Sequence, residues 1–289
     1  MEIRDASTVL LLRDGDDGLE VFMVRRHLNS DFVGGAYVFP GGAVDPEDAS
    51  DLSALVDGLS AERADEILGV ERALRFFVAG VREVFEEAGI LLAYDREGRW
   101  VEAWDRAEIS RFEEHRRRLN AREATMTDVC REEGLRIAAD RLVFFSHWIT
   151  PPGPPRRFDT RFFLAAMPEF QDGLHDDNET VDSMWVRPAD ALRLAEAGEV
   201  QIIFPTARSL EAVAQHETVA DALTSAAART GVPVTRPKVV RDPQGIRVII
   251  PGDPGYDEAE EVEISAFPPG HDASPTGRVG PLVPDPGEA

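Results

Sequence analysis

The sequence predicts an α/β fold, because segments with the pattern of strands alternate with helical ones. Two segments rich in Val and Leu, 7–13 and 19–25, flank a turn-forming stretch at 14–18 and are expected to pair as a hairpin. From 71 to 88 apolar residues recur every three or four positions, which indicates a helix with one buried face. Further buried strands are expected at 142–148 and 161–167.

Composition restricts the class of protein. With 43% hydrophobic residues, a chain of 289 residues can bury a large core, in one large domain or two small ones. The net charge of -23 argues against a nucleic-acid partner, since the longest basic run, 116–118, lies in a mixed-charge helical segment. One cysteine, Cys130, precludes an internal disulfide, and we expect it to be buried in a protein of a reducing compartment.

We expect a cytoplasmic protein that does not bind a membrane. No apolar run reaches the length of a membrane span, residues 1–5 do not resemble a signal peptide, and residues 286–289 do not resemble a peroxisomal ending.

The remaining elements follow in order. After a loop at 29–36 we expect a strand at 37–39, then a turn at Gly41-Gly42. Residues 51–70 are expected to contain a helix capped by Ser60, followed by the long helix and a strand at 90–94. The charged segment 105–140 is helix-like and forms either a lid or part of a substrate pocket, or a packing element with no ligand role.

In the C-terminal half, prolines and glycines mark where the expected elements begin and end. Prolines make 150–155 irregular, and 171–180 is a polar loop. A helix should run from Pro188 to Glu196, where Gly198 ends it, and another from 205 to 229. Residues 232–250 are expected to form strands, and the Pro-, Gly- and acid-rich remainder from 251 to be extended or disordered.

Three glutamates mark the candidate site. On a helix, Glu83 and Glu87 stand one turn apart on the same face, and Glu86 lies beside Glu83. Two like charges about 6 Å apart repel by roughly 3 kcal/mol at an effective dielectric of about 20, so the cluster favours a bound cation. Oxygen ligands suit Mg²⁺ or Mn²⁺. Arg82, four residues before Glu86, is placed to fix one carboxylate, although an ordinary solvated acidic face has the same glutamate spacing.

Residues 82–90 resemble the second half of the Nudix box, G-x5-E-x7-R-E-U-x-E-E-x-G-U, and Phe39-Pro40-Gly41-Gly42 resembles its opening. The two halves are separated by roughly 26 residues more than the pattern allows. Such a split box is a feature of the branch that resembles the coenzyme A diphosphatases. The other segments similar to that branch are 38–45, 85–92, 149–151, 156–163 and 204–206.

The resemblance implies an α/β/α sandwich with a mixed sheet, helical insertions and a C-terminal extension. The Nudix domain would span 1–230 with insertions at about 49–72 and 105–140, and 231–289 would be a strand-containing appendix and acidic tail. Asp48 stands where the family has Glu as a partner for the arginine, but its shorter side chain and the insertion argue against pairing with Arg82.

The resemblance also implies roles for single residues. Glu83, Glu86, Glu87 and the Gly42 carbonyl would hold Mg²⁺ or Mn²⁺, with Arg82 and Glu179 as the other catalytic residues and Glu179 as a base or further ligand. Arg26, Arg161 and Phe158 are the candidate substrate-binding residues, with Trp148 as a further contact for the substrate.

The expected reaction is metal-dependent hydrolysis of coenzyme A or acyl-coenzyme A to 3′,5′-ADP and a 4′-phosphopantetheine product. The alternatives are a pyrophosphatase for ADP-ribose or an NADH-type dinucleotide, and a catalytically inactive Nudix-like binding module. The only expected partner is a small nucleotide-containing substrate, and the sequence leaves a homodimer open.

Overall fold

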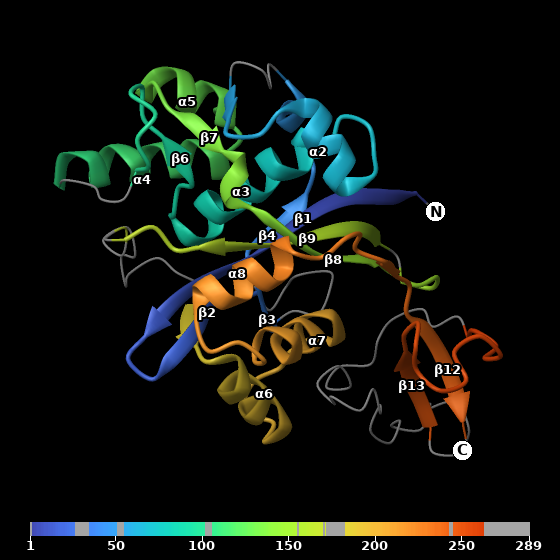
Figure 1. Ribbon diagram of the computed structural model, residues 1–289. Helices are drawn as coiled ribbons and strands as arrows, with labels where there is room; N and C mark the ends of the chain where they lie inside the picture. Colours follow the sequence, from blue (N-terminus) through green and yellow to red (C-terminus); the bar gives the residue numbers. More distant parts are fainter. Residues whose placement is uncertain are drawn as a thin grey trace.

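The computed structural model describes residues 2–26, 35–50, 55–101, 106–154, 156–169, 171, 183–242 and 245–262. Within these ranges the chain forms a mixed sheet with helices on both faces, so the expected α/β/α sandwich is confirmed (Figure 1). No helix in these ranges is both long and apolar enough to cross a bilayer.

The central sheet has the strand order β10-β2-β1-β9-β8-β11, with β3 paired to β2 and β4 to β1. Its strands are β1 (Ile3–Gly15), β2 (Gly18–Arg25), β3 (Tyr37–Val38), β4 (Gly41–Ala43), β8 (Val143–Ile149), β9 (Arg157–Ala166), β10 (Ser183–Val186) and β11 (Val234–Thr235). The predicted β1–β2 hairpin is confirmed, whereas β1 and β9, neighbours far apart in sequence, run parallel.

One face of the sheet carries the layer with the acidic helix. This layer holds α2 (Ala61–Leu68), α3 (Leu74–Ala88), α4 (Arg106–Asn120), α5 (Met126–Glu133), a small sheet of β5 (Val56–Asp57), β7 (Arg136–Ala138) and β6 (Ala93–Tyr94), and the short 3-10 helices η1 (Pro46–Ala49) and η2 (Ala139–Arg141). Ser60 caps α2 by accepting from the Arg63 amide, and Gly89 ends α3 in the left-handed conformation, both as the sequence indicates.

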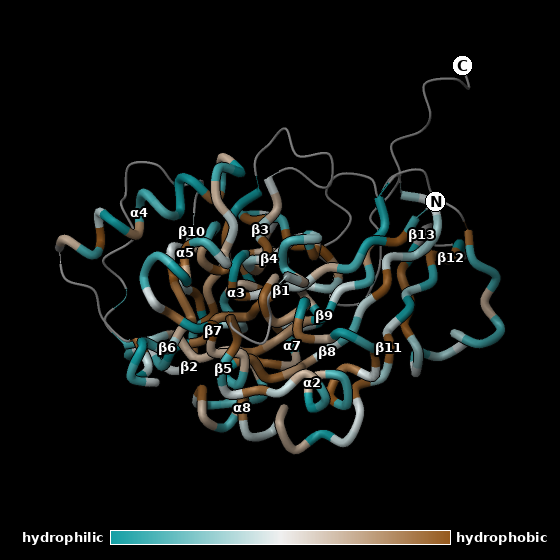
Figure 2. Tube along the Cα trace, turned by 90° about the horizontal axis from the view of Figure 1, so that it is seen from above, coloured by the Kyte–Doolittle hydropathy of each residue, from teal (hydrophilic) through white to brown (hydrophobic). Residues whose placement is uncertain are grey.

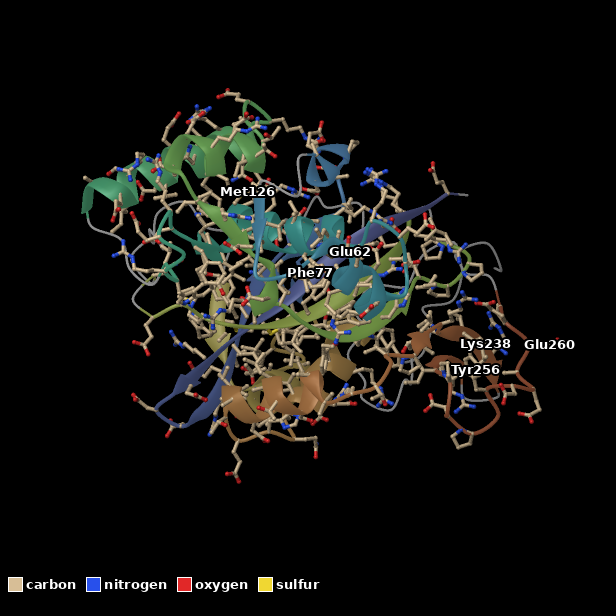
Figure 3. The ribbon with its side chains drawn as sticks, turned by 45° about the horizontal axis from the view of Figure 1, so that its top comes forward. Glu62, Phe77, Met126, Lys238, Tyr256 and Glu260 are labelled. Carbon is tan, nitrogen blue, oxygen red and sulfur yellow. The ribbon has the colours of Figure 1, made fainter. Side chains whose placement is uncertain are left out.

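The helix α3 packs directly on the centre of the sheet. Phe77 of α3 lies 4.8 Å from Phe163 of β9 between ring centroids, and the view in Figure 3 places Phe77 in the middle of the molecule. The Ser7 hydroxyl of β1 donates to the Phe76 carbonyl of α3 at 2.7 Å. These contacts fix the helix, and therefore its glutamates, against β1 and β9.

The opposite face is covered by α6 (Pro188–Glu196), α7 (Phe204–Val213) and α8 (Val219–Ala227). The predicted bounds of α6 are confirmed. The single helix expected from 205 to 229 is wrong, because Thr218 adopts an extended conformation and caps a new helix by accepting from the Asp221 amide.

Side chains of the central strands alternate between two cores. Val9 and Leu11 of β1 face the α3 layer, whereas Leu10 and Leu12 face α6, α7 and α8. Viewed from above, the central strands carry the most hydrophobic part of the chain and the outer helix α4 a hydrophilic one (Figure 2). Cys130 is 2% exposed, which confirms its expected burial.

The segment 232–250 forms strands, as expected, but in two separate places. β11 extends the main sheet by pairing parallel with β8, and β12 (Lys238–Asp242) and β13 (Gly245–Ile249) form a hairpin of their own at the side of the domain (Figure 1). Residues 243–244, between β12 and β13, lie outside the described residues.

Gln171 ties the chain that follows α3 to the end of the sheet. Its fully buried side chain accepts from the Leu91 amide at 3.0 Å and donates to the carbonyls of Leu91 and Val101 at 3.1 and 2.7 Å. The strand expected at 90–94 therefore shortens to Ala93–Tyr94, because the polar groups of Leu91 bond to a side chain instead of a strand.

Replacing Gln171 with Ala should lower the free energy of unfolding by about 3 kcal/mol, since it leaves three buried backbone groups without these partners. Chemical denaturation in urea measures the change. The matched control is Gln215→Ala, whose exposed amide makes one bond to the Glu211 carbonyl and whose loss should cost less than about 0.5 kcal/mol. Equal effects of the two substitutions would contradict this role of Gln171.

Candidate active site

The three glutamates of α3 lie together at a largely buried end of the helix. The side chains of Glu83 and Glu86 are only 12% and 18% exposed, and Glu87 accepts a hydrogen bond from the Gly41 amide at 3.0 Å. A solvated acidic face would instead expose such side chains to water. The burial of these glutamates therefore contradicts the solvated acidic face that their sequence spacing also allows.

Gly41 and Gly42 lie in strand β4, where we expected a turn. They pair with Thr8 and Ser7 of β1, and neither has a positive φ. Glycine is needed for close approach instead: a Cβ on Gly41 would lie 2.6 Å from the Ser7 carbonyl oxygen, and one on Gly42 would collide with the Glu83 carboxylate. The two glycines bring the backbone of β4 directly against the carboxylates of α3.

Arg82 is the centre of the cluster. Its guanidinium, 9% exposed, donates to Asp48 at 2.9 and 3.0 Å, to Glu83 at 2.8 Å and to Glu86 at 3.2 Å. Its remaining contact is with the Ala43 carbonyl of β4 at 2.9 Å. The planar donor set therefore fixes two of the glutamates, the end of β4 and η1 in one geometry.

Asp48 is paired with Arg82 in spite of the insertion. Its side chain is 2% exposed and binds the guanidinium with both oxygens, and it also accepts from the Asp45 amide at 2.8 Å in the capping box of η1. The short helix η1 brings the backbone close enough for an aspartate to reach. The expectation that its shorter side chain would prevent this pairing is wrong.

Burial raises the pKa values of the glutamates of α3. The pKa of Glu83 rises to about 7, since desolvation and the charge of Glu86 outweigh the attraction of Arg82. The pKa of Glu87 rises to about 8, because desolvation and the charge of Glu83 outweigh the Gly41 amide and the charge of Arg26. Burial alone would lower the pKa of Arg82, but its hydrogen bond to Asp48 and the surrounding carboxylates keep it charged.

The chemistry of this donor set fits a hard divalent cation. One guanidinium faces Asp45, Asp48, Glu83 and Glu86, so the cluster carries excess negative charge, and this repulsion adds to burial in raising the pKa values of Glu83 and Glu87. Oxygen ligands of this kind suit Mg²⁺ or Mn²⁺. Among the described residues, no three acidic, histidine or cysteine side chains already surround a common point as metal ligands.

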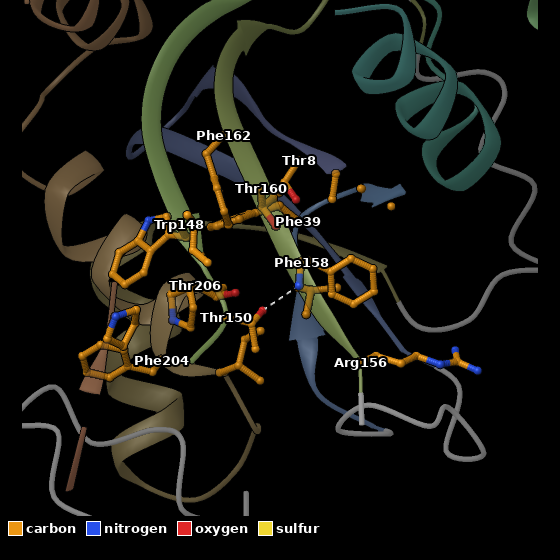
Figure 4. Close-up of a pocket in the computed structure, with 18 of the residues that line it drawn as sticks. Thr8, Phe39, Trp148, Thr150, Arg156, Phe158, Thr160, Phe162, Phe204 and Thr206 are labelled. Atoms are coloured by element: carbon orange, nitrogen blue, oxygen red, sulfur yellow. Dashed lines mark hydrogen bonds between the residues drawn. The ribbon is translucent and has the colours of Figure 1, made fainter. Parts of the chain in front are cut away.

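An apolar cavity of about 350 Å³ borders β4, on the face of the sheet that carries α7. Figure 4 shows its aromatic lining, in which Trp148, Phe158, Phe162 and Phe204 come from β8, β9 and α7. The Phe158 amide donates to the Thr150 hydroxyl at 3.0 Å, the dashed line in the figure, which fixes the irregular connection to β9. Gly41, Gly42 and Ala43 also line this cavity.

The structure separates the predicted substrate-binding residues. Arg26 and Phe158 line the apolar cavity, but Arg161 does not. Alternate residues of β9 point to opposite faces, so Arg161 is directed toward the α3 layer, where it pairs with Asp159 and stacks 4.4 Å over the Phe76 ring. The structure thus brings Arg26 and Phe158 together and leaves Arg161, 3% exposed, among structural contacts.

The charged segment that contains α4 and α5 contributes to a second cavity. This polar cavity, of about 430 Å³, is bordered by Asp48, Arg82, Glu83 and Glu86 on one side and by the connection from α4 to α5 on the other. Residues of the segment 105–140 therefore form part of a pocket next to the acidic cluster, which is one of the roles expected for this segment. The α4 helix also packs on α3 through Phe85 and Phe112, whose rings are 6.2 Å apart.

Some site residues lie beyond what sequence patterns reveal. Glu179 is outside the described residues, so the role given to it stays a prediction. Arg4, Pro237 and Val248 line the apolar cavity and carry no motif. Arg4 pairs with Phe158 of β9, and the pairing of β11 with β8 places Pro237 and the following hairpin beside the cavity; neither pairing has a local sequence signal.

Known proteins are similar to this chain in sequence and in structure. A chicken (Gallus gallus) protein named acyl-coenzyme A diphosphatase NUDT19 is 26% identical, over 88% of this chain and 80% of its own length. The human (Homo sapiens) protein of the same name is 25% identical, over 83% and 73%. A solved NUDIX hydrolase from Alicyclobacillus acidocaldarius is 26% identical with a TM-score of 0.63, covering 80% of this chain and 99% of that one.

The family model described as the NUDT19 Nudix domain matches residues 53–211. This segment includes α3 with all of its glutamates, and it is more than half of the chain. The protein therefore belongs to the NUDT19 Nudix domain family and is a Nudix-type diphosphatase.

Proposed function

We propose that the protein hydrolyses the diphosphate linkage of coenzyme A or acyl-coenzyme A, giving 3′,5′-ADP and a 4′-phosphopantetheine product. The observation that carries the proposal is that one strand, β4, is shared by two sites. Its glycines contact the carboxylates of α3 and line the apolar cavity. A substrate with a diphosphate next to a long, weakly polar arm matches this pair of sites, and the names of the chicken and human relatives agree with it.

The chain's own residues divide the work. Glu83, Glu86, Glu87 and the Gly42 carbonyl are the groups that would hold Mg²⁺ or Mn²⁺, which when bound neutralises the diphosphate and lowers the pKa of a coordinated water. Arg82 holds Glu83 and Glu86 in fixed rotamers, and the Gly41 amide does the same for Glu87. Since these groups are already oriented, little reorganisation is needed when substrate arrives.

The cavity supplies the recognition. Arg26 lines it and its charge acts on Glu87, so this arginine is within electrostatic reach of the acidic cluster and would bind a substrate phosphate. The rings of Phe158 and Trp148 would contact the adenine or the pantetheine arm. In the reaction, the oxygen of water adds to one phosphorus as the bridging P–O bond breaks, and the other phosphate leaves; Glu179 is predicted from the sequence as the base or as a further metal ligand.

The substrate panel tests the proposal directly. Purified protein with Mg²⁺ should hydrolyse coenzyme A and acyl-coenzyme A with a kcat/KM at least about tenfold above that for ADP-ribose or NADH, a difference of about 1.4 kcal/mol in the barrier. Chromatography identifies 3′,5′-ADP as the nucleotide product. Selective turnover of ADP-ribose or NADH would overturn the substrate assignment, and tight nucleotide binding without any metal-dependent hydrolysis would identify a binding module.

Metal binding should stabilise the protein more at high pH than at low pH. Folding raises the pKa values of Glu83 and Glu87 from 4.5 to about 7 and about 8, so the protonated carboxyls stabilise the metal-free fold at low pH, and this stability is lost as the pH rises from about 4.5 through about 8. A cation binds the deprotonated carboxylates, so the Tm increase with saturating Mg²⁺ or Mn²⁺ should be small near pH 6 and correspond to about 2–3 kcal/mol near pH 8.5.

Thermal unfolding with and without metal measures this difference. Glu83→Gln should remove most of the pH dependence, whereas Glu62→Gln, on the exposed side of α2, should leave it unchanged. A metal-induced Tm shift that is the same at both pH values would contradict the assignment of these carboxylates.

Replacing Asp48 with Asn should lower the free energy of unfolding by about 3 kcal/mol, because it leaves the buried charge of Arg82 without its bidentate partner. Asp190→Asn is the control, since Asp190 pairs with the exposed Arg187 at the start of α6 and its loss should cost less than about 1 kcal/mol. Guanidinium denaturation compares the two variants. An unchanged midpoint for Asp48→Asn would show that the pair does not stabilise the cluster.

A further inference from the structure

The hairpin of β12 and β13 borders the apolar cavity although it lies outside the matched family domain. The family match ends at residue 211, whereas the hairpin spans 238–249. Pro237, at its base, and Val248 of β13 both line the cavity. Nothing in the family match therefore accounts for this part of the cavity wall.

The base of the hairpin is attached to the main sheet. Val234 and Thr235 of β11 pair parallel with His147 and Trp148 of β8. Only two residues, Arg236 and Pro237, connect β11 to the start of β12. Since Trp148 is itself a cavity residue, the same strand pairing that positions the aromatic lining also positions the hairpin.

The hairpin is held as a folded unit. The Lys238 ammonium donates to the Tyr256 carbonyl at 2.7 Å and lies 4.5 Å from the centre of the Tyr256 ring, while the Tyr256 hydroxyl donates to the Arg236 carbonyl at 2.6 Å. Figure 3 shows Lys238 and Tyr256 side by side at this end of the molecule. The Val262 amide adds a bond to the Val239 carbonyl at 2.7 Å, so the returning chain lines β12 as well.

Val248 is the side chain by which the hairpin joins the core. It is 7% exposed and belongs to the same hydrophobic cluster as Trp148, Phe162 and Phe204. In the hairpin register Val248 stands opposite Val239, and Val240 stands opposite Arg247. Because alternate residues of a strand face opposite ways, Val248 and Val240 lie on different faces of the hairpin.

We propose that β12 and β13 form a wall of the substrate cavity, and that Val248 limits the length of the acyl chain the enzyme accepts. The inference rests on the proposed function, because it requires an acyl-coenzyme A substrate. Its chemical basis is that the cavity is mainly apolar, is about 350 Å³ in volume and is lined by Val248 on the side of the hairpin. The side chain at 248 therefore sets how much apolar substituent fits.

The test is a chain-length profile. Kinetics with free coenzyme A and with acetyl, octanoyl and palmitoyl thioesters would be measured for the wild type, Val248→Ala and Val248→Trp. Filling the cavity with Trp should lower kcat/KM for palmitoyl relative to free coenzyme A by about tenfold or more, and Ala should raise that ratio. Each thioester is compared with free coenzyme A on the same variant, so a change that affects the coenzyme A part of the substrate cancels in the ratio.

Val240→Ala is the matched control, since it removes the same two methyl groups from a side chain that is 5% exposed and absent from the cavity lining. Thermal unfolding checks that each variant folds, and the Ala variant alone decides the question if Trp does not fold. An unchanged profile for Val248→Ala, or an equal change for Val240→Ala, overturns the inference while acyl-coenzyme A activity stands. A wild type that cleaves only ADP-ribose or NADH overturns the proposed function and this inference together.

Discussion

A buried guanidinium surrounded by more carboxylates than it can neutralise is the interaction on which the rest of this structure depends. Arg82 joins α3, η1 and β4 through hydrogen bonds to Asp48, Glu83, Glu86 and the Ala43 carbonyl. It holds the cluster together and still leaves it negatively charged. Burial and the mutual repulsion of the carboxylates raise their pKa values, and the excess of negative charge favours a bound cation, which an anionic substrate needs in order to approach.

The absence of side chains on two residues is the second constraint. β4 separates a polar cavity from an apolar one, and Ala43 borders both. Because Gly41 and Gly42 have no Cβ, the carboxylates of Glu83 and Glu87 approach the strand directly, and the backbone itself forms the boundary between the two environments. A substrate with a charged diphosphate next to a weakly polar arm is suited to such a boundary.

The sequence predicts those features that have a local period. The spacing of Glu83 and Glu87 follows from the helical repeat, and the ends of α3 and α6 follow from Gly89 and Gly198. It fails where distant segments meet. Asp48 reaches Arg82 across an insertion whose path the sequence does not show. Gly41 and Gly42 pair with β1 instead of forming a turn. Val248 lines the cavity from a hairpin that lies beyond the matched family domain. Arg161 is instructive, because its odd spacing from Phe158 on one strand places it on the opposite face.

The parallel pairing of β1 with β9 determines when the protein can complete its fold during synthesis. Ile3 to Leu12 pair with residues 157–166, so the central pair of strands joins parts of the chain that leave the ribosome far apart in time. Contacts of such high sequence separation slow folding, because loop closure is paid in entropy before the strands associate. Until residue 166 has emerged, the apolar face of α3 lacks Phe163 beneath it, and the nascent chain exposes surface that chaperones recognise.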